Sequence, residues 1–185
     1  PAQRFAERTG PVRVLVVGGS LGAKALNDIV PQALALMPQA TRPTVIHQSG
    51  AKQIDALRAN YEAAGVQAEL TPFIDDTASA FAQADLVICR AGASTVTELA
   101  AVGVAAVFVP FPFAVDDHQT TNAQFLVASG GGWLVPQAEL TAQNLAERLT
   151  ALSRDTLQDV AQKAHAQKKT NATREVVMAC EELAA

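Results

Sequence analysis

Short apolar runs alternate with amphipathic stretches along most of this chain. The run 12–17 (VRVLVV) is rich in β-branched residues and ends at Gly18, which is typical of a strand buried on both faces of a sheet. The next stretch, 23–37, spaces its apolar residues three and four positions apart, as one face of a helix does, and Pro38 ends it. The first part of the chain therefore predicts a strand, a glycine loop and a helix.

The same alternation continues along most of the remaining chain. The expected strands are 44–47, 67–71, 86–88, 105–109 and 132–135, and the expected helices are 51–64, 76–83, 95–102 and 119–128. From Thr141 onward the strand patterns stop, and a composition rich in Ala, Gln, Glu and Lys predicts two or three helices. This alternation predicts an α/β fold, a Rossmann-like doubly wound parallel sheet with helices on both faces and further C-terminal helices. No repeat or linker interrupts it, so residues 1–185 are expected to form a single domain.

Composition and charge exclude several classes of partner. The 185 residues are 49% hydrophobic, which is enough for a sizeable core, and they carry a formal net charge of −4. Because nucleic acid binding needs a basic face and this chain has no cluster of Lys or Arg, no nucleic acid partner is expected. Cys89 and Cys180 lie far apart with no Cys or His at metal-ligand spacing, so neither a disulfide framework nor a metal site is predicted. Such cysteines suit a reducing cytoplasm.

No targeting or membrane-spanning segment is predicted. Residues 1–10 are polar and lack the apolar stretch of a signal peptide, and the first residue is Pro1 rather than Met. The sequence is therefore expected to be a piece cut from a longer protein. The apolar stretch 99–115 is shorter than a membrane span and is interrupted by Gly103 and two prolines, so it is interpreted as a helix end followed by a buried strand.

The first candidate ligand loop is GGSLG at 18–22. Ligands of an open parallel sheet bind beyond the carboxyl ends of its strands, where this loop lies. Its glycines allow close backbone approach, and the helix that follows offers N–H groups to an anion. Val17 breaks the dinucleotide-binding pattern G-x-G-x-x-G, and no Gly-Lys-Ser/Thr follows to make an ATP-binding loop. The alternative is a tight turn in which Ser20 only caps the helix.

A second loop, CRAGASTVTE at 89–98, joins a buried strand to a helix. Ala93, Ser94 and Thr95 are placed to offer backbone N–H groups and hydroxyls to a diphosphate, whose charge the helix macrodipole favours. Glu98 is expected on the first turn of the helix, where its carboxylate could accept hydrogen bonds from two neighbouring ribose hydroxyls. The competing interpretation makes Glu98 the glutamate of a capping box, with Ser94 or Thr95 near the cap.

Polar side chains gather in a third loop, PFPFAVDDHQTTNA at 110–123, between a buried strand and a helix. Asp117, His118, Gln119 and Asn122 lie within about a turn of one another, and this mixture of groups suits a hydroxyl-rich ligand. His118 has no neighbouring nucleophile or metal ligand in the sequence, so a ligand contact is preferred to a catalytic base. The simpler alternative is a helix N-cap at one of the two aspartates, flanked by solvated residues.

The turn TPFIDD at 71–76 follows the third expected strand. An apolar side chain beside free backbone N–H and C=O groups could hold a flat base there. The alternative is a turn in which Asp75 or Asp76 caps the next helix. The sequence leaves both interpretations open.

Taken together, these motifs resemble those of the lipid I N-acetylglucosaminyltransferase family of bacterial peptidoglycan synthesis. GGSLGAKALN at 18–27, FIDD at 73–76, CRAGASTVTELAAVG at 89–103 and DDHQTTNA at 116–123 occur in that family's order and spacing. Each motif is weak alone, but the set covers almost the whole chain. The resemblance implies one half of a GT-B fold, whose C-terminal domain binds UDP-N-acetylglucosamine (UDP-GlcNAc) in the cleft between two Rossmann-like domains.

The resemblance also implies a role for each loop. The backbone at Ile74 would contact uracil and Glu98 the ribose hydroxyls. Ser20 together with Ala93, Ser94 and Thr95 would hold the diphosphate, and His118 and Gln119 would face the sugar hydroxyls. The implied reaction is inverting and needs no metal or other cofactor, because loop N–H groups stabilise the departing UDP while the acceptor hydroxyl attacks the anomeric carbon. The residues implied to bind substrate all lie in loops that follow strands: Gly19, Ser20, Ile74, Ala93, Ser94, Thr95, Glu98, His118 and Gln119.

One half of that family's enzyme has no counterpart in this sequence. The N-terminal domain carries the acceptor-binding loops, a proposed catalytic base and a membrane-facing patch, so catalytic residues are expected there and the present chain is expected to bind donor without transferring it. The expected partners are UDP-GlcNAc, lipid I through the N-terminal domain, and the complementary half. The full enzyme would lie on the cytoplasmic face of the inner membrane. Phe113 stands where many relatives carry His, so no polar contact is expected from it.

Three other functions compete with this one. A UDP-GlcNAc 2-epimerase shares the fold and the nucleotide sugar, although the GGS loop together with DDHQ fits the transferase better. A separate donor-binding subunit of a split lipid-linked transferase would show the same sequence features. A doubly wound fold used only as a scaffold is the third, because fold does not imply function.

Overall fold

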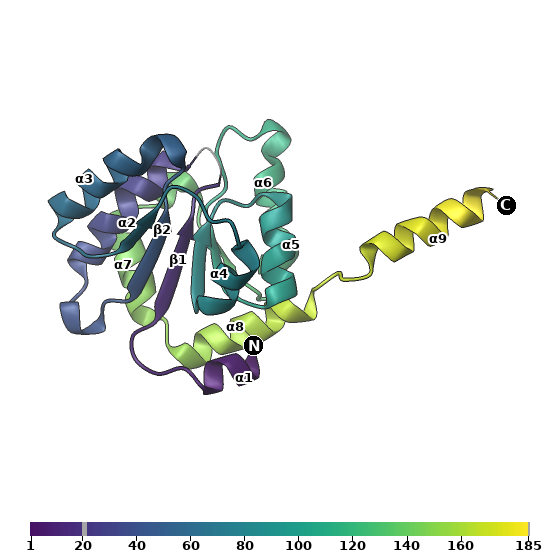
Figure 1. The fold of residues 1–185 in the computed structure, drawn as a ribbon, viewed down its shortest axis with the longest axis horizontal. Helices are drawn as coiled ribbons and strands as arrows, with labels where there is room; N and C mark the ends of the chain where they lie inside the picture. Colours follow the sequence, from purple (N-terminus) through teal and green to yellow (C-terminus); the bar gives the residue numbers. More distant parts are fainter. Residues whose placement is uncertain (20–21, 185) are drawn as a thin grey trace.

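The computed structural model describes residues 1–19 and 22–184 and confirms the predicted α/β architecture (Figure 1). The strands are β1 (Arg13–Val17), β2 (Thr44–Gln48), β3 (Glu69–Thr71), β4 (Leu86–Cys89), β5 (Ala105–Phe108) and β6 (Trp133–Leu134). The helices are α1 (Ala2–Ala6), α2 (Lys24–Leu36), α3 (Ile54–Ala64), α4 (Thr77–Gln83), α5 (Ala93–Val102), α6 (His118–Val127), α7 (Ala142–Ala151), α8 (Arg154–Ala166) and α9 (Ala172–Ala184). Every expected strand and helix is present, most of them within two residues of the expected bounds.

The sheet is doubly wound, as the sequence predicts. Its strand order is β3-β2-β1-β4-β5-β6, and each neighbouring pair is parallel. The chain therefore moves outward from β1 to β3, returns to the other side of β1 at β4, and moves outward again to β6. Helices α2, α3 and α7 pack against one face, and α4, α5 and α6 pack against the other. The order reverses between β1 and β4, which is the point where such sheets bind ligands.

The strands are apolar throughout because both of their faces are buried. Successive residues of a strand point to opposite faces. In β1, Val14 and Val16 belong to the core on the α2 side, whereas Leu15 belongs to the core on the α5 side. The same alternation separates Ile88 from Cys89 in β4. The two cores together explain why the strands show continuous apolar runs rather than an alternation of apolar and polar residues.

A buried carboxylate fixes the segment that precedes β1. Asp85, whose exposure is 0%, lies just before β4 and accepts a hydrogen bond of 2.8 Å from the backbone N–H of Arg13. It is ion-paired with Arg8 and, at 3.6 Å, with Arg154 of α8. A buried charge is stable only when it is paired in this way.

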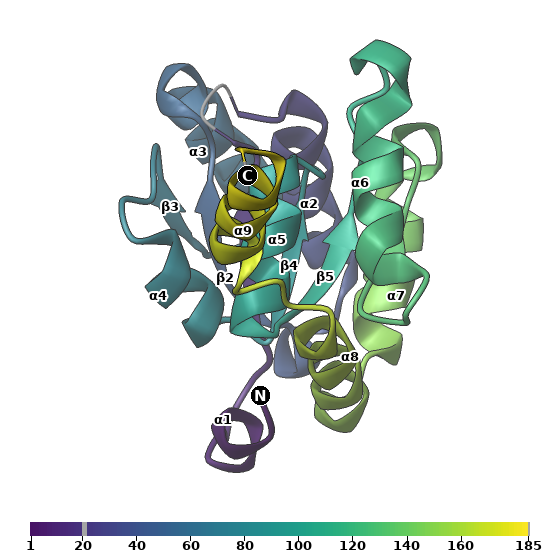
Figure 2. The ribbon, with the colours of Figure 1, turned by 90° about the vertical axis from the view of Figure 1, so that its right-hand side faces the viewer.

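Helix α1, which the sequence did not predict, ends two residues before Arg8 and lies at the lower end of the molecule (Figure 2). It is held there by Arg4, which donates to the carbonyl oxygens of Val102 and Gly103, and by Phe5, which is buried in the core.

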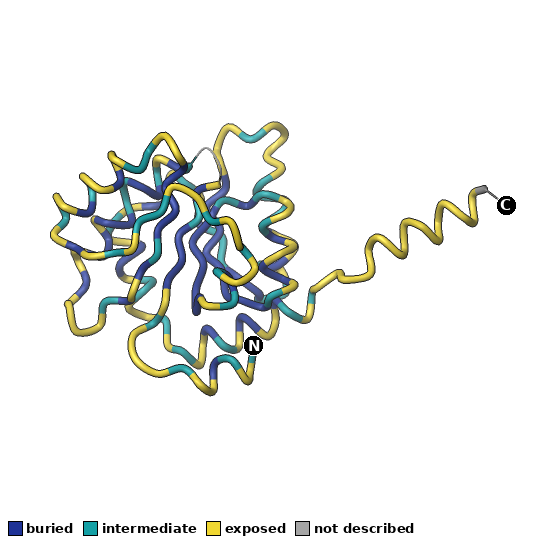
Figure 3. Tube along the Cα trace, in the orientation of Figure 1, coloured by how far each residue is buried: buried dark blue, intermediate teal, exposed yellow. Residues whose placement is uncertain are grey.

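The tail forms three helices, in agreement with the prediction of two or three, but only two of them pack on the sheet. Helices α7 and α8 add Leu145, Leu157 and Ala161 to the core. Helix α9 extends away from the rest of the molecule and is exposed along its length (Figures 1 and 3). Within the described ranges, the helices are too short or too polar to cross a membrane.

A buried histidine lies between β2 and the helices α2 and α3. The Nδ1 atom of His47 is 3.0 Å from the Tyr61 hydroxyl, and its Nε2 atom is 3.0 Å from Oδ1 of Asn27. One ring nitrogen can donate while the other accepts, so this pair of partners suits a neutral imidazole. Burial lowers the pKa of His47 to about 3.

The depressed pKa predicts an acid-dependent loss of stability. In the unfolded chain His47 has an ordinary pKa of about 6.5, so between that pH and the folded pKa of about 3 only the unfolded chain binds the proton. Lowering the pH from 7.5 to 5 should reduce the free energy of unfolding by about 2 kcal/mol through this group. His47→Gln should lose this component, as measured by urea unfolding at both pH values.

The control for this prediction is His118→Gln, which replaces an exposed histidine and leaves His47 in place. This variant should show the same difference in the free energy of unfolding between pH 7.5 and pH 5 as the parent chain. An identical acid loss in the parent chain and in His47→Gln would show that another group causes it.

Candidate functional site

A cavity of about 700 Å³ opens at the reversal of strand order. Val17 and Cys89, the last residues of β1 and β4, pair in register, so the loops after them start side by side. A volume of this size is in the range of small-molecule sites. Residues from these two loops, from α2, from the loop after β5 and from the segment after β6 line it: Val17, Gly18, Gly19, Gly22, Ala23, Lys24, Ala25, Asp28, Arg90, Gly92, Thr95, Phe111, Gln119 and Gln137.

Two helices begin at this cavity without side-chain caps. The N-cap residues of α2 and α5 are Ala23 and Gly92, and neither makes a side-chain hydrogen bond to the helix. By contrast, α4, α7 and α8 have the capping side chains of Asp76, Thr141 and Ser153. The first N–H groups of a helix need acceptors, and the macrodipole makes negative acceptors favourable. The arrangement of α2 and α5 therefore suits an anion in the cavity.

The glycines of the first loop are required by close backbone contacts. A Cβ atom on Gly18 would lie 2.5 Å from the backbone nitrogen of Ala23, and one on Gly22 would lie 2.0 Å from the carbonyl oxygen of Ser49. Gly22 also has a φ of +76°, which favours glycine. Gly19 lines the cavity, whereas Ser20, the expected neighbour of the diphosphate, lies outside the described residues.

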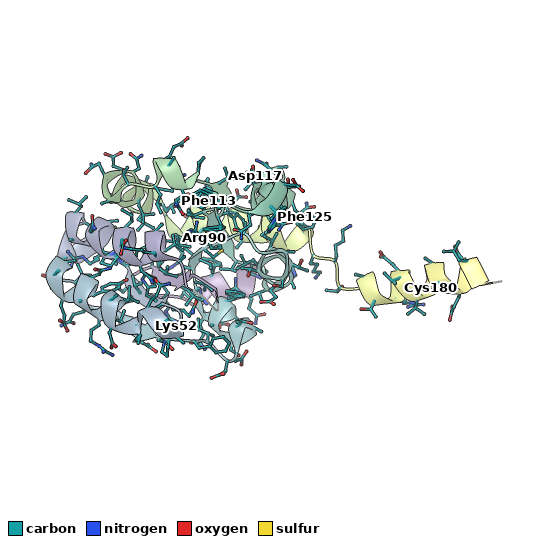
Figure 4. All side chains as sticks on the ribbon, turned by 90° about the horizontal axis from the view of Figure 1, so that it is seen from above. Lys52, Arg90, Phe113, Asp117, Phe125 and Cys180 are labelled. Atoms are coloured by element: carbon teal, nitrogen blue, oxygen red, sulfur yellow. The ribbon has the colours of Figure 1, made fainter. Side chains whose placement is uncertain are left out.

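Arg90 ties three loops together at the mouth of the cavity. Its guanidinium donates to the carbonyl oxygens of Val109 and Pro110, each at 3.0 Å, and to Oε1 of Gln137 at 2.6 Å. It also lies 5.5 Å from the ring centroid of Phe111, which is cation–π distance. Burial lowers the pKa of Arg90. Viewed from above, Arg90 lies near the middle of this edge of the molecule (Figure 4).

Gln119, an expected sugar contact, is positioned by the backbone of two loops. Its Oε1 atom accepts hydrogen bonds from the N–H groups of Ala91, at 3.3 Å, and Phe111, at 3.0 Å. Asn122 of the same helix donates to the carbonyl oxygen of Ala91 at 3.0 Å. Gln119 lines the cavity, and among the described residues none accepts from its amide N–H groups. The amide therefore has one end fixed and the other available to a ligand.

His118 lies at the exposed start of α6, outside the lining of the cavity. Its Nδ1 atom donates to the carbonyl oxygen of Val115 at 2.8 Å, which leaves Nε2 as an acceptor in the neutral ring. The two preceding residues, Asp116 and Asp117, have φ values of +50° and +49°. This conformation is strained for a residue with a Cβ, although Asp tolerates it better than most. Asp117 occupies the N-cap position but accepts from the Thr120 hydroxyl, at 2.7 Å, instead of capping the backbone.

The capping-box interpretation of Glu98 is wrong. Helix α5 begins at Ala93, two residues earlier than expected, and its N-cap is Gly92. Glu98 is thus on the second turn rather than the first, too far along to reach the cap. Its Oε2 atom instead accepts a hydrogen bond of 3.3 Å from the hydroxyl of Thr77, at the start of α4. Ala93 and Ser94 are exposed on the first turn of α5, and Thr95 lines the cavity.

The turn before α4 lies beside Glu98 because Thr77 bridges the two helices. Asp76 caps α4 by accepting from the N–H of Ser79 at 2.9 Å, so the N-cap alternative for this turn is confirmed. Hydrogen bonding from the side chain of Ser79, and then from its backbone N–H, lowers the pKa of Asp76. Ile74 is half-buried, and within the described part of the chain its backbone N–H and C=O make no hydrogen bond. The cap therefore leaves the backbone of Ile74 free for a flat ligand.

The expected site residues fall into two neighbouring groups. Gly19, Thr95 and Gln119 share the cavity, whereas Glu98 and Ile74 lie near the start of α4, outside the lining of that cavity. The sequence reasoning gave no role to other residues of the cavity, namely Lys24, Asp28, Arg90, Phe111 and Gln137. The role of Arg90 could have been predicted from the sequence, because an arginine directly after a buried strand must find hydrogen-bond acceptors. The role of Gln137 could not, since its contact with Arg90 spans 47 residues of sequence.

Two other hollows lie away from this edge. One of about 630 Å³ is bordered by Arg13, Thr44 and Glu69 at the starts of their strands, and one of about 460 Å³ lies beside Trp133 and α7. Neither lies at the reversal of strand order or has a helix N-terminus free of a cap. A third hollow, of about 410 Å³, lies between α5 and α6 and reaches Ala93, but it is not at the reversal of strand order. The cavity between β1 and β4 combines that position with two uncapped helix starts and is the candidate functional site.

Cys89, the last residue of β4, is buried behind the cavity. Burial raises the pKa of the Cys89 thiol to about 12, so it stays protonated at neutral pH. The described residues contain no group of three or more His, Cys, Asp or Glu side chains placed to hold a metal ion. What the arrangement offers is a set of N–H donors and hydroxyls with the carboxylates of Asp28 and Glu98, and this combination suits a charged, hydroxyl-rich ligand.

Known proteins match this chain in sequence. The model of the glycosyltransferase family 28 C-terminal domain matches residues 13–177. A UDP-N-acetylglucosamine–N-acetylmuramyl-(pentapeptide) pyrophosphoryl-undecaprenol N-acetylglucosamine transferase from Verminephrobacter eiseniae is 68% identical over 185 residues, which cover 100% of this chain and 52% of that protein. The chain thus spans about half the length of this relative.

Solved structures match it as well. The crystal structure of MurG from Acinetobacter baumannii has a TM-score of 0.90 and 43% sequence identity, over 98% of this chain and 52% of that one. The UDP-GlcNAc 2-epimerase of Neisseria meningitidis, solved with UDP-GlcNAc bound, has a TM-score of 0.63 at 13% identity, over 98% of this chain and 46% of that one. At that identity the epimerase shows a shared fold alone.

The geometry of the glycine loop predicts a steric effect of one methyl group. Gly18→Ala places a Cβ atom 2.5 Å from the backbone nitrogen of Ala23, so the loop must move. We expect a loss of about 1–3 kcal/mol in the free energy of unfolding, measured by urea titration, because overpacking at a rigid contact costs that much. Gly92→Ala is the matched control, since its Cβ meets only the Thr95 hydroxyl, at 3.7 Å, and should cost less than about 1 kcal/mol. Equal losses in both variants would contradict the steric explanation.

Proposed function

This chain belongs to the glycosyltransferase family 28 C-terminal domains, and from that premise we propose that it is the UDP-GlcNAc-binding half of a two-domain inverting glycosyltransferase. The whole protein would transfer N-acetylglucosamine to undecaprenyl-diphospho-N-acetylmuramoyl-pentapeptide (lipid I), forming lipid II for peptidoglycan. Residues 1–185 would act as one domain of it. The observation that carries the proposal is the cavity at the reversal of strand order, where α2 and α5 begin without side-chain caps.

The diphosphate of the donor would lie at the start of α5. The first helical hydrogen bond runs from the N–H of Val96 to Gly92, so the N–H groups of Ala93, Ser94 and Thr95 have no acceptor within the helix. Gly19 brings the glycine loop to the opposite side of the same cavity, and Ser20 would extend that contact. Two phosphates between two helix N-termini would receive hydrogen bonds and a favourable macrodipole from both sides.

The nucleoside would lie on the far side of α5. Glu98 is exposed, and its carboxylate could accept from the two ribose hydroxyls in a bidentate contact. The turn containing Ile74 is close to Glu98 because Thr77 bridges α4 and α5. The free backbone groups of Ile74 would pair with the edge of uracil. This placement puts base, ribose and diphosphate in sequence along one line of loops.

The sugar would face the start of α6. The amide N–H groups of Gln119 are donors toward the cavity, and Nε2 of His118 is an acceptor. Donors and acceptors together suit the hydroxyl and acetamido groups of N-acetylglucosamine. We assign both residues to sugar binding rather than to proton transfer, and the catalytic base to the other half of the protein.

The proposed reaction breaks the bond between the anomeric carbon and the diphosphate oxygen. The acceptor hydroxyl attacks from the opposite side, so the configuration inverts and negative charge grows on the departing UDP. N–H groups already fixed at the starts of α2 and α5 would stabilise that charge without rearranging. In this scheme the helix N-termini do the work that a metal ion does in other transferases, and no cofactor is required.

Helix α9 supports the existence of a second half. Ala172, Val176, Ala179 and Leu183 recur along one face of the helix at spacings of four and three. Val176 is 63% exposed and Leu183 is 89% exposed. An amphipathic helix needs a surface to cover its apolar face, and the body of this chain does not supply one (Figure 3). We propose that the part of the relatives beyond this chain's span covers it.

The same half would provide the acceptor site and the location of the enzyme. The relative from Verminephrobacter eiseniae is named for an acceptor on pyrophosphoryl-undecaprenol, which is a membrane lipid. We therefore propose that lipid I is bound through the complementary half and that the full enzyme is peripheral on the cytoplasmic face of the inner membrane. The C-terminal half described above supplies only the donor.

Calorimetric titration tests the donor site. UDP-GlcNAc should bind the purified chain, with UDP-N-acetylgalactosamine and TDP-glucose binding more weakly. Glu98→Ala should raise the Kd for UDP-GlcNAc at least about tenfold, because hydrogen bonds to a charged group contribute about 1.5–3 kcal/mol. Glu62→Ala, which removes an exposed carboxylate from α3, is the matched control and should bind like the parent. Absence of binding to any of the three nucleotide sugars would refute the proposal.

Assembly with the complementary half tests the proposal that acceptor binding and catalysis need that half. The chain alone should transfer no N-acetylglucosamine to lipid I, and adding the complementary half of the Verminephrobacter eiseniae relative should restore transfer. The double variant Val176→Glu, Leu183→Glu should lower the restored rate at least about tenfold, since it charges the apolar face of α9, while leaving the Kd for UDP-GlcNAc unchanged.

The control for α9 is Glu182→Ala on the polar face, which should keep the restored rate. Turnover of lipid I by the chain alone would contradict the assignment of the catalytic base to the other half. Full restoration by the double variant would contradict the role of α9.

A further inference from the structure

Gln48 occupies a place in the sheet from which one side chain can reach two loops of the candidate site. It is the last residue of β2, which lies between β1 and β3. In register it pairs with Val17 on one side and with Thr71 on the other, and these are the last residues of their strands. The glycine loop begins directly after Val17, and the turn that contains Ile74 begins directly after Thr71. Gln48 therefore lies between the two loops.

The carboxamide of Gln48 uses all of its polar atoms to join these loops. Its Oε1 atom accepts a hydrogen bond of 3.1 Å from the N–H of Gly18. Its Nε2 atom donates to the carbonyl oxygens of Gly19 and Pro72, each at 3.0 Å. Gln48 is 3% exposed, so water has little access to these bonds. Buried hydrogen bonds of this kind are costly to lose, because their partners stay desolvated without a replacement.

No close substitute provides the same contacts. Glutamate has the length but no N–H donor for Gly19 and Pro72, and methionine has neither donor nor strong acceptor. Asparagine keeps the carboxamide but is one methylene shorter, so it cannot span the gap that Gln48 spans. The position thus requires a glutamine for a reason other than filling space.

The next residue shows that the end of β2 supports the glycine loop. The carbonyl oxygen of Ser49 lies where a Cβ atom of Gly22 would be, and it also accepts from Nδ2 of Asn27 at 3.2 Å. The glycine loop and the start of α2 therefore pack against residues 48–49 at the end of β2. Gln48 extends this support to Pro72, two residues before Ile74.

We propose that Gln48 is a positioning residue of the donor site, whose carboxamide holds the glycine loop and the turn at 72–76 at the spacing that a nucleoside diphosphate spans. The inference rests on the proposed function, which assigns the diphosphate to the first loop and the base to the second. Gln48 itself is buried beneath both loops and does not touch the donor. Gln48 therefore sets the distance between the two loops, rather than the contacts that either loop makes with the donor.

This spacing gives a distinctive binding signature. Uridine contacts the turn at 72–76 and Glu98, whereas UDP and UDP-GlcNAc contact those groups and the glycine loop as well. A ligand that spans both loops gains affinity from their fixed spacing, and a ligand that contacts one does not. Losing the hydrogen bonds of Gln48 to the two loops should therefore weaken the binding of UDP much more than the binding of uridine.

The test uses Gln48→Glu, Gln48→Met and Gln48→Asn in the purified chain. Calorimetry measures the Kd of UDP-GlcNAc and of UDP directly, and that of uridine by displacement, at a temperature where circular dichroism shows each variant folded. The Asn variant is the mildest and keeps the comparison possible if the other two fail to fold. Ser49→Ala is the matched control, since it removes a neighbouring buried hydroxyl that bonds to Gly50 at 2.9 Å and leaves the hydrogen bonds of Gln48 intact.

In the folded Gln48 variants the Kd for UDP and UDP-GlcNAc should rise tenfold or more, and that for uridine less than about threefold. Ser49→Ala should change the Kd values of UDP-GlcNAc, UDP and uridine by less than about threefold. Equal losses for uridine and UDP, or no loss for UDP, would overturn the role of Gln48. Failure of the parent chain to bind UDP-GlcNAc would overturn the proposed function instead, and the role of Gln48 with it.

Discussion

The parallel pairing of six short strands, covered by helices on both faces, is the constraint on which the rest of this structure depends. A parallel strand can follow its neighbour only after a crossover, so every strand ends at the same edge of the sheet. Every loop that follows a strand therefore opens at that edge. Between β1 and β4 the crossovers turn to opposite sides, and the two loops part around a cavity. The location of the candidate site is therefore set by the order of the strands in the doubly wound sheet, not by any single sequence motif.

The loops around that cavity are fixed by side chains that bond to backbone. Arg90 holds the carbonyl groups of Val109 and Pro110, and Gln119 holds the N–H groups of Ala91 and Phe111. These contacts place the loops without occupying the starts of α2 and α5, whose N-cap residues carry no capping side chain. The helix N–H groups thus remain for a ligand and are already oriented when it arrives, which is what electrostatic stabilisation of a charged leaving group requires.

Two exposed apolar features stand out on the described part of the chain. Helix α9 carries an uncovered apolar face, and Phe113, which is 81% exposed, lies on the loop that borders the cavity (Figure 4). In the proposed two-domain enzyme, both would lie against the complementary half. The match to about half the length of the relative leads to the same conclusion by a different route.

The strands, the helices, the glycine loop and the polar loops after β4 and β5 were predictable from the sequence, because apolar periodicity and turn chemistry act over a few neighbouring residues. The start of α5 was not, since a Ser-Thr-Glu pattern favoured a cap that Gly92 displaced, and this moved Glu98 from the first turn to a place beside Thr77. Helix α1 was also missed, because it is held by the contacts of Arg4 with Val102 and Gly103 and by the burial of Phe5 rather than by its own pattern. The contacts of Arg90 with Gln137 and of Gln48 with Gly18 and Pro72 join residues 24 to 47 positions apart. Such contacts depend on strand order and register, which arise from the packing of crossovers on the sheet, so only the folded chain decides which loops meet.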